Sequence, residues 1–271
     1  MRILLFFLIC INLAFADANI TKAKTLILEF DKKNLEYILL NNKKINFFQN
    51  PKDKDKVLVI FSTPYKNYKS KNTIKAVYKN NVFKTININV NNGNYKSEKI
   101  QVQKDKVFPP KKVKNQISKD YKEAISVYSQ YTNKALFNSK FQKPIDSLIT
   151  SDFGKARLYN DKISNYHSGT DFRAKMQTPI KASNDGIVKI AKNRYFSGNS
   201  VIIDHGLGIY SQYYHLDKIN VKKGEFVKKG QIIGLSGRSG RVTGPHLHFG
   251  IIINSKQVDP IDFIEKINLY Y

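Results

Sequence analysis

Five histidines are the side chains of this sequence best suited to bind a metal and to move protons near neutral pH. The chain contains a single Cys, Cys10, which lies in an apolar run near the N-terminus. A disulfide framework and a cysteine metal site are therefore both excluded. Any metal would have to be bound by His and carboxylate groups. The five histidines all lie between residues 167 and 248: His167, His205, His215, His246 and His248.

Two of these histidines are one residue apart, in the segment that leads into the apolar run 250–253. That run has the composition of a β-strand. Since side chains at i and i+2 of a strand share a face, His246 and His248 would lie side by side, with Leu247 on the opposite face. One imidazole could then bind a metal while the other reached a substrate at that metal.

A second motif, His167-Ser168-Gly169-Thr170-Asp171, joins a neutral nitrogen donor to an anionic oxygen donor across a turn that contains Gly. With one of the strand histidines it gives a His2Asp set. Three protein ligands leave the fourth position of tetrahedral zinc open for water, as in catalytic zinc sites. The motif HExxH is absent, so the expected general base is a His and not a Glu.

Each motif is weak by itself. A lone His-x-His pair is commonly structural, His-x-x-x-Asp arises by chance, and an isolated His such as His215 is more often a hydrogen-bonded structural residue. Their common position carries the inference, because 13 of the 14 Gly also follow residue 150 and only Gly93 precedes it. The C-terminal part therefore carries the predicted chemistry.

The elements that must position these residues are mainly β. Residues 17–107 contain short alternating apolar runs between Asn- and Lys-rich turns, which predicts an immunoglobulin-like β-sandwich with an accessory or regulatory role. Residues 108–148 are expected to form a connector, with a helix over 118–131 and an extended segment after it. Residues 149–271 are predicted to be a Gly-rich antiparallel β domain with a groove, ending in a short helix.

The N-terminus predicts export. Residues 1–16 read as a secretory signal peptide, with Arg2, an apolar stretch and the cleavage motif Ala14-Phe15-Ala16. No later segment is long and apolar enough to span a bilayer, so no integral membrane segment is expected in the mature chain. Export also argues against nucleic acid as the partner of this basic protein.

The formal charge is +25, and removal of residues 1–16 would leave +24. Such a charge is typical of proteins that bind polyanions. The same Lys- and Asn-rich composition is also what an AT-rich genome encodes without any binding role. Both interpretations stay open. Most of the excess positive charge lies in residues 17–150, whose net charge is +16, whereas residues 151–271 have a net charge of +8.

The C-terminal region resembles the lysostaphin-type (LytM-like) zinc peptidases of the bacterial cell wall. The resemblance spans about Ser151 to Phe263 and rests on seven blocks in the family's order: Ser151-Asp152-Phe153-Gly154, His167-Ser168-Gly169-Thr170-Asp171, Ala182-Ser183-Asn184-Asp185-Gly186-Ile187-Val188, Tyr195-Phe196-Ser197-Gly198-Asn199, Ile203-Asp204-His205-Gly206, Tyr214-His215-Leu216 and Thr243-Gly244-Pro245-His246-Leu247-His248.

The resemblance implies residue roles. His167, Asp171 and His248 would bind one Zn2+ per chain, and His215 and His246 would be the catalytic pair. His205 would be structural or would orient the site from outside it. The residues expected to line the substrate groove are Arg157, Tyr195 and Phe196.

The resemblance also implies a function: a periplasmic, cell-wall-associated endopeptidase of a Gram-negative bacterium that hydrolyses peptide cross-links in peptidoglycan. The expected bond is D-alanyl–diaminopimelate, with carboxypeptidase activity on uncross-linked stems as an addition and roles in wall remodelling, cell shape or division. The alternative is a non-catalytic activator or wall-binding protein that regulates another hydrolase. The sequence identifies no regulatory partner.

Overall fold

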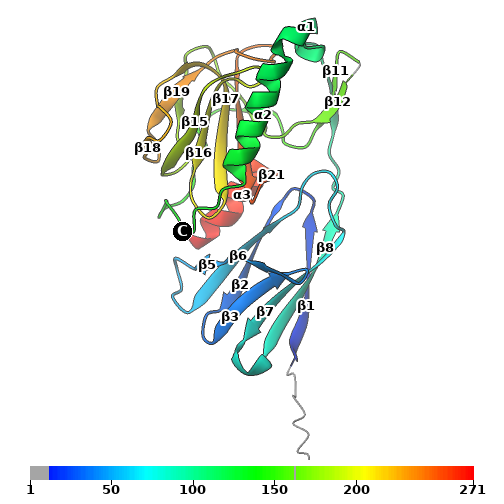
Figure 1. Ribbon diagram of the computed structural model, residues 1–271, viewed down its shortest axis with the longest axis vertical. Helices are drawn as coiled ribbons and strands as arrows, with labels where there is room; N and C mark the ends of the chain where they lie inside the picture. Colours follow the sequence, from blue (N-terminus) through cyan, green and yellow to red (C-terminus); the bar gives the residue numbers. More distant parts are fainter. Residues whose placement is uncertain (1–11, 162) are drawn as a thin grey trace, which may run out of the picture.

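The computed structural model describes residues 12–161 and 163–271 and is built almost entirely of β-strands (Figure 1). It confirms the predicted mainly β fold class. In Figure 1 the sandwich lies below the Gly-rich half. Helix α3 (Pro260–Ile267) and strand β21 (Lys256–Val258) lie at the junction of the two halves. The predicted signal peptide falls largely on residues 1–11, outside the described part, so it stays a prediction; residues 12–16 begin the first strand.

Two sheets form the N-terminal sandwich because alternate residues of their strands are apolar and share one buried core. Strand β1 pairs in parallel with β8, and the other pairs are antiparallel. The first sheet has the order β1 (Asn12–Thr21), β8 (Phe83–Asn91), β7 (Lys71–Tyr78), β3 (Leu35–Leu40) and β4 (Lys43–Ile45). The second consists of β2 (Thr25–Asp31), β6 (Lys56–Ser62) and β5 (Phe48–Gln49).

The segment after the sandwich joins the other half. Strand β9 (Ser97–Ile100) pairs in parallel with β11 (Ala156–Tyr159), which pairs with β12 (Ile163–Tyr166). Short helix α1 (Lys104–Val107) follows, and then α2 (Lys114–Tyr128), which packs Ala124, Val127 and Tyr128 on the C-terminal sheet. Helix α2 begins four residues before the predicted Ser118, because its first turn is polar and exposed and gives no apolar periodicity.

The C-terminal half is one large antiparallel sheet around an apolar core. Its main path is β10 (Ile149–Ser151), β13 (Thr170–Arg173), β20 (His246–Ile253), β17 (Ile209–Ile219), β16 (Gly198–Asp204), β15 (Gly186–Arg194) and β18 (Phe226–Val227). Beside it lie β14 (Pro179–Lys181), β19 (Ile232–Ser236) and β21 (Lys256–Val258). The final helix, α3 (Pro260–Ile267), is the one expected there, and Asp259 caps it.

The two halves are held together by polar and apolar contacts. Lys24 forms an ion pair with Asp259 at 2.7 Å, and the backbone N–H of Thr25 donates to Asp262 at 2.7 Å. Ile27 and Ile60 of the sandwich pack against the core of the other half. The sandwich is therefore fixed against the C-terminal sheet.

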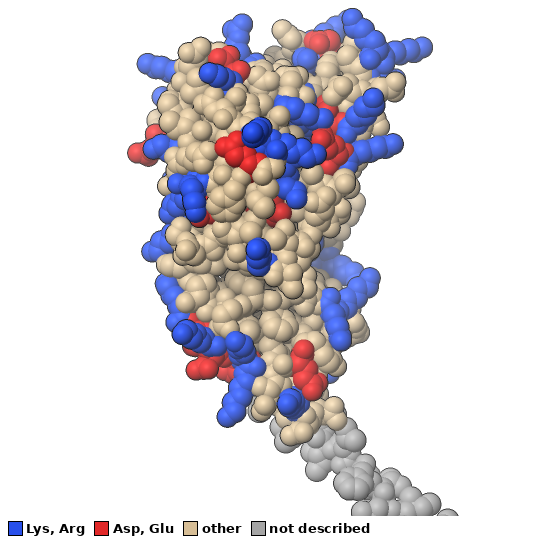
Figure 2. All heavy atoms as spheres, turned by 60° about the vertical axis from the view of Figure 1, so that its left-hand side comes forward, with Lys and Arg blue, Asp and Glu red and all other residues tan. Residues whose placement is uncertain are grey.

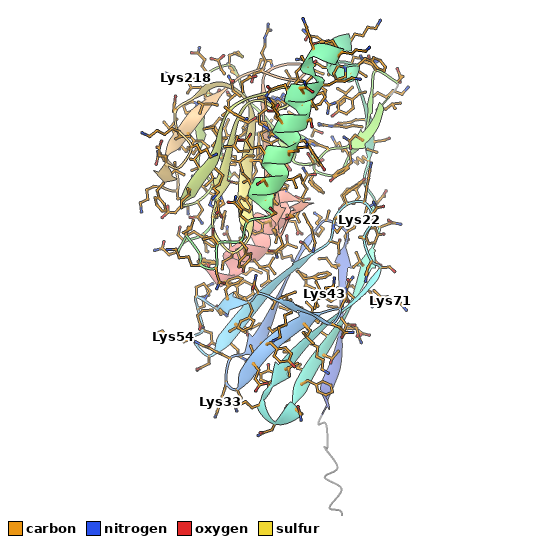
Figure 3. All side chains as sticks on the ribbon, viewed as in Figure 1. Lys22, Lys33, Lys43, Lys54, Lys71 and Lys218 are labelled. Carbon is orange, nitrogen blue, oxygen red and sulfur yellow. The ribbon has the colours of Figure 1, made fainter. Side chains whose placement is uncertain are left out.

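Basic side chains are spread over the surface. In the face shown in Figure 2, Lys and Arg are scattered over both halves and do not gather in one patch. Among the lysines labelled in Figure 3, Lys33 and Lys54 lie in the sandwich and Lys218 lies in the C-terminal half. Within the described chain, no helix is long and apolar enough to cross a membrane.

Candidate metal centre and active site

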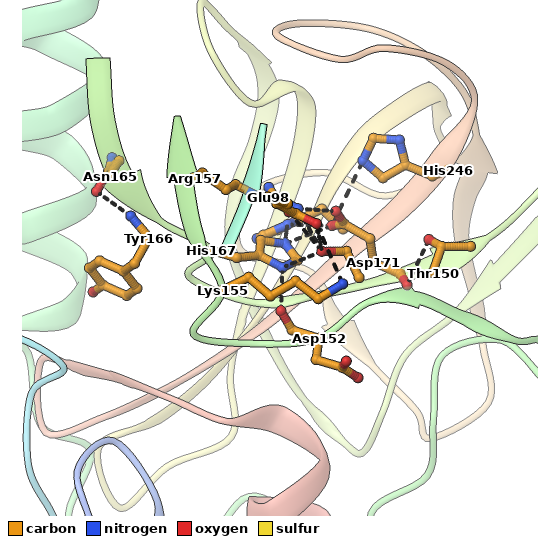
Figure 4. Close-up of polar contacts among 12 residues, drawn as sticks. Glu98, Thr150, Asp152, Lys155, Arg157, Asn165, Tyr166, His167, Asp171 and His246 are labelled. Atoms are coloured by element: carbon orange, nitrogen blue, oxygen red, sulfur yellow. Dashed lines mark hydrogen bonds and ion pairs between the residues drawn. The ribbon is translucent and has the colours of Figure 1, made fainter. Parts of the chain in front are cut away.

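Three ligand atoms converge on one point beside strand β20. His167 Nε2 lies 2.9 Å from Asp171 Oδ1 and 3.0 Å from His248 Nδ1, and the last two atoms are 2.8 Å apart. All three side chains are buried. Figure 4 shows His167 and Asp171 facing each other, with His246 to one side. Tetrahedral zinc with bonds of 2.0–2.1 Å separates its ligand atoms by about 3.3 Å, so a small outward shift would fit the ion.

Strand register produces this convergence. Asp171 of β13 lies directly opposite His248 of β20, and Leu247 points into the core, as strand alternation predicts. Gly169 permits the close approach of these strands, since a Cβ on it would lie 2.6 Å from His248 Nε2 and 2.4 Å from the Phe249 carbonyl oxygen. His167 follows β12, at the start of the turn that leads into β13.

The charges of the three groups suit a divalent cation. Burial lowers the pKa of His248 to about 4, so this imidazole is neutral at neutral pH. Burial alone would raise the pKa of Asp171, but its contacts with His167 and His248 outweigh burial and hold that pKa well below its usual range. His167 Nδ1 donates to the Asp152 carbonyl at 2.8 Å, which directs Nε2 at the carboxylate. A cation bound by these atoms would replace the proton between His248 Nδ1 and Asp171 Oδ1.

Two further histidines lie next to this donor set. His215 follows Tyr214 on β17, and its ring centroid is 4.9 Å from that of His246. Nδ1 of His215 donates to the Ser239 carbonyl and Nδ1 of His246 to the Gly244 carbonyl, at 2.8 and 2.9 Å. Within the described residues no hydrogen bond is made by Nε2 of either ring, so this atom is available for proton transfer. Nε2 of His246 is 3.8 Å from Asp171 Oδ1.

The backbone at His215 is held in an unusual conformation. Its φ is +65°, a left-handed value that non-Gly residues adopt mainly where the surroundings fix them. The His215 N–H donates to the Ser197 carbonyl at 2.9 Å, and the side-chain bond to Ser239 fixes the ring. Burial, together with the neighbouring His246 and His248, lowers the pKa of His215 well below its usual value. This imidazole is therefore neutral, and because Nδ1 carries the proton, Nε2 is unprotonated.

A cavity of about 440 Å³ opens beside the donor set, lined by Asp171, His215 and His246 among others. Arg241 lines it as well, and its guanidinium lies over the rings of Tyr159 and Phe196, at 4.3 and 4.7 Å from their centroids. Among the residues that the structure describes, no carboxylate forms an ion pair with Arg241. A planar guanidinium of this kind is suited to bind a carboxylate with two hydrogen bonds.

The remaining predicted site residues take different positions. Phe196 lines a smaller neighbouring cavity of about 120 Å³, together with His215 and His248. Arg157 lines the cavity too, and its Nη2 donates to Asp171 Oδ2 at 2.7 Å. Tyr195 lies against α1, where its hydroxyl donates to the Asp105 carbonyl at 2.9 Å. Tyr195 is not among the residues that line the cavity.

His205 lies in the core, apart from the donor set. Its Nδ1 donates to the Asp185 carbonyl and its Nε2 contacts the Ser211 hydroxyl, both at 2.7 Å. Burial lowers the pKa of His205 to about 4. These contacts join the turn before β15 to strand β17, as a structural histidine would.

Sequence reasoning missed two residues at the site, Arg241 and Glu98. Arg241 stands two residues before the block that begins at Thr243, and a cation so close to that block was an available signal. No sequence signal indicated Glu98, because it lies in the N-terminal half among scattered acids. It nevertheless lines the same cavity as Arg241.

An antiparallel β fold that gathers a His–Asp–His donor set beside two free imidazoles is typical of a metallopeptidase site. A family model described as Peptidase family M23 matches residues 165–260. This part of the chain is therefore a domain of that metallopeptidase family.

Similar proteins carry related names. Over 123 residues the chain is 46% identical to the peptidoglycan DD-endopeptidase ShyA of Vibrio cholerae, covering 44% of this chain and 29% of ShyA. Over 106 residues it is 43% identical to lysostaphin of Staphylococcus simulans, covering 37% of this chain and 22% of that protein. The chain thus spans less than a third of the length of these relatives.

A solved structure extends the likeness beyond the matched region. A Pseudomonas aeruginosa protein assigned to peptidase M23 aligns over 90% of this chain and 94% of its own, with a TM-score of 0.67 and 22% identity. At that identity the likeness concerns the fold alone. It includes the N-terminal half.

Proposed function

We propose that this chain is an exported zinc endopeptidase that hydrolyses peptide cross-links in peptidoglycan, in the periplasm of a Gram-negative bacterium. The names of ShyA and its relatives support this substrate. The observation that carries the proposal is the convergence of three ligand atoms within 3.0 Å of one another, with two free imidazoles beside them.

In this proposal His167, Asp171 and His248 hold the zinc. When bound, the ion supplies Lewis acidity to the scissile carbonyl and lowers the pKa of the attacking water. His215 and His246 move the protons. Nε2 of one takes a proton from the water, and a proton is returned to the leaving amine, so the peptide bond breaks as the new acid forms. The carbonyls that hold their Nδ1 atoms keep both rings aimed into the cavity.

The groove supports an acidic peptide as substrate. The Arg241 guanidinium lies over two aromatic rings and has no described acid as its partner, and Arg241 lines the same cavity as His215 and His246. Diaminopimelate stems carry free carboxylates, which match a planar guanidinium. We therefore assign the D-alanyl–diaminopimelate cross-link as the bond cleaved, with carboxypeptidase activity on uncross-linked stems as a secondary reaction.

Mass spectrometry of muropeptides tests the proposal. Purified full-length chain loaded with zinc is incubated with peptidoglycan, alongside the Asp171→Asn variant. The expected result is conversion of cross-linked dimers to monomers by the wild type only, with about a 1000-fold loss of rate in the variant. A wild type that binds one zinc, cleaves no bond and stimulates a second hydrolase would overturn the proposal in favour of an activator.

A further inference from the structure

The N-terminal half contributes one acid to the metal site. Glu98 lies on β9, the strand that leaves the sandwich and pairs with β11 of the other half. Register places it opposite Arg157 in that parallel pair. Tyr95, just before β9, packs its ring against Gly154 and Phe153, which fixes the strand at this edge.

Glu98 reaches the ligand Asp171 through one guanidinium. Arg157 Nε donates to Glu98 Oε1 at 2.6 Å, and its Nη2 donates to Asp171 Oδ2 at 2.7 Å (Figure 4). The Arg157 side chain is only 12% exposed, so water competes little for these bonds. Ser151 adds a third partner, since its hydroxyl lies 3.0 Å from Glu98 Oε1 and 3.0 Å from Arg157 Nη2.

This chain of contacts selects which Asp171 oxygen faces the metal point. Arg157 occupies Oδ2, and only Oδ1 lies close to His167 and His248. A guanidinium beside a dication would by itself oppose metal binding, because both are positive. The negative charge of Glu98, which also pairs with Lys155 at 3.4 Å, offsets part of that repulsion. The short bond from Arg157 Nε to Glu98 fixes the plane of the guanidinium.

We propose that Glu98 is a positioning residue of the metal site, which holds Arg157 against Asp171 so that this carboxylate binds the ion through Oδ1 alone. The inference rests on the metal ligands assigned under the proposed function. Glu98 precedes residues 165–260, the part that matches the family model, so the site of this chain is completed by a segment outside that match. Residues that orient metal ligands typically change metal affinity about 10- to 100-fold.

Zinc affinity of the Glu98→Gln variant tests this role. Zinc is titrated against a chromophoric chelator in full-length wild type, Glu98→Gln and Glu98→Asp. The expected result is about a 10- to 100-fold weaker affinity for Glu98→Gln, a fall in kcat with KM nearly unchanged, and partial rescue by Glu98→Asp. The matched control is Asp161→Asn, which removes an acid paired with Lys99 of the same strand but without contact to Arg157. Its affinity should equal that of the wild type.

Thermal unfolding of the metal-free proteins separates positioning from folding. If Glu98→Gln lowers the midpoint of the metal-free protein but binds zinc as tightly as the wild type, Glu98 only joins the two halves and the inference is wrong. In that case the proposed function still holds, provided that the wild type binds zinc and cleaves peptidoglycan. If the wild type binds no zinc at this site, the ligand assignment fails and the inference fails with it.

Discussion

Asp171 and His248 lie directly opposite each other on antiparallel strands, and their Oδ1 and Nδ1 atoms are 2.8 Å apart. They are 77 residues apart in the sequence, so only the pairing of β13 with β20 brings them together. A cross-strand pair on a buried sheet is a rigid support, which suits ligands that must keep their geometry during turnover.

The two free imidazoles should be required for rate and not for metal binding. His215→Asn and His246→Ala should each lower kcat by about 100- to 10,000-fold, because each removes a proton acceptor. Asn is chosen at position 215 because it tolerates the positive φ there. Stopped assays on muropeptide dimers give kcat, and plasma mass spectrometry gives the zinc content. Loss of zinc in either variant would instead assign that residue to the ligand set.

Close strand approach at Gly169 should make this position intolerant of a methyl group. Gly169→Ala would place its Cβ against the Phe249 carbonyl and His248 Nε2, and overpacking of this kind costs about 1–3 kcal/mol. Urea unfolding of metal-free protein measures the free energy, and zinc titration measures the affinity, which should also fall. Gly244→Ala is the control, because a Cβ there meets nothing within 4 Å. Equal stability of the two variants would contradict the packing argument.

How far the sequence reveals the site depends on the range of the contacts. The His-x-His alternation and the turn that joins His167 to Asp171 are local patterns, so the strand and the donors could be predicted from spacing. The bond from Arg157 to Asp171 and the contribution of Glu98 depend on how distant segments pair, and no local periodicity records that. The parallel pairing of β9 with β11 shows this limit. Strand β9 lies within residues 17–107, the range predicted for the sandwich, but it pairs with a strand of the other half.

Helix α2 shows the same limit at an element boundary. The stripe of Tyr121, Ala124 and Tyr128 predicts a helix, and the structure contains one. Its first turn, from Lys114 to Ile117, is mostly exposed and polar, so hydrophobic periodicity cannot mark its start. The positive φ of His215 could not be predicted from the sequence either, because hydrogen bonds to the carbonyls of Ser197 and Ser239 impose it.

Stability of the metal-free protein should fall in mild acid because of His205. Its pKa is about 4 in the folded chain and about 6.5 when unfolded, so between these values the unfolded chain binds a proton that the folded chain excludes. The free energy of unfolding should therefore drop by about 2 kcal/mol between pH 7 and pH 5 from this group. Urea unfolding at both pH values measures the drop.

The comparison with His205→Asn isolates this contribution. His215 and His248 also have lowered pKa values and titrate in the same direction, but they do so equally in both proteins. The variant is expected to be less stable at pH 7, since it loses the bonds to Asp185 and Ser211, and to show a smaller drop at pH 5. An unchanged pH dependence would mean that His205 is protonated in the folded chain.

Arg241 should determine preference for a carboxylate in the substrate. Arg241→Lys keeps the charge but loses the planar guanidinium beside Tyr159 and Phe196, so KM for a muropeptide dimer with free diaminopimelate carboxylates should rise about 10- to 100-fold. With amidated diaminopimelate the wild type itself should bind weakly, and the variant should differ little from it. Arg238→Lys is the matched control, because Arg238 is an exposed cation of the same loop that lines a neighbouring cavity without the catalytic histidines. Equal loss of activity by Arg241→Lys on the free and the amidated substrate would show that Arg241 shapes the groove but does not bind the carboxylate.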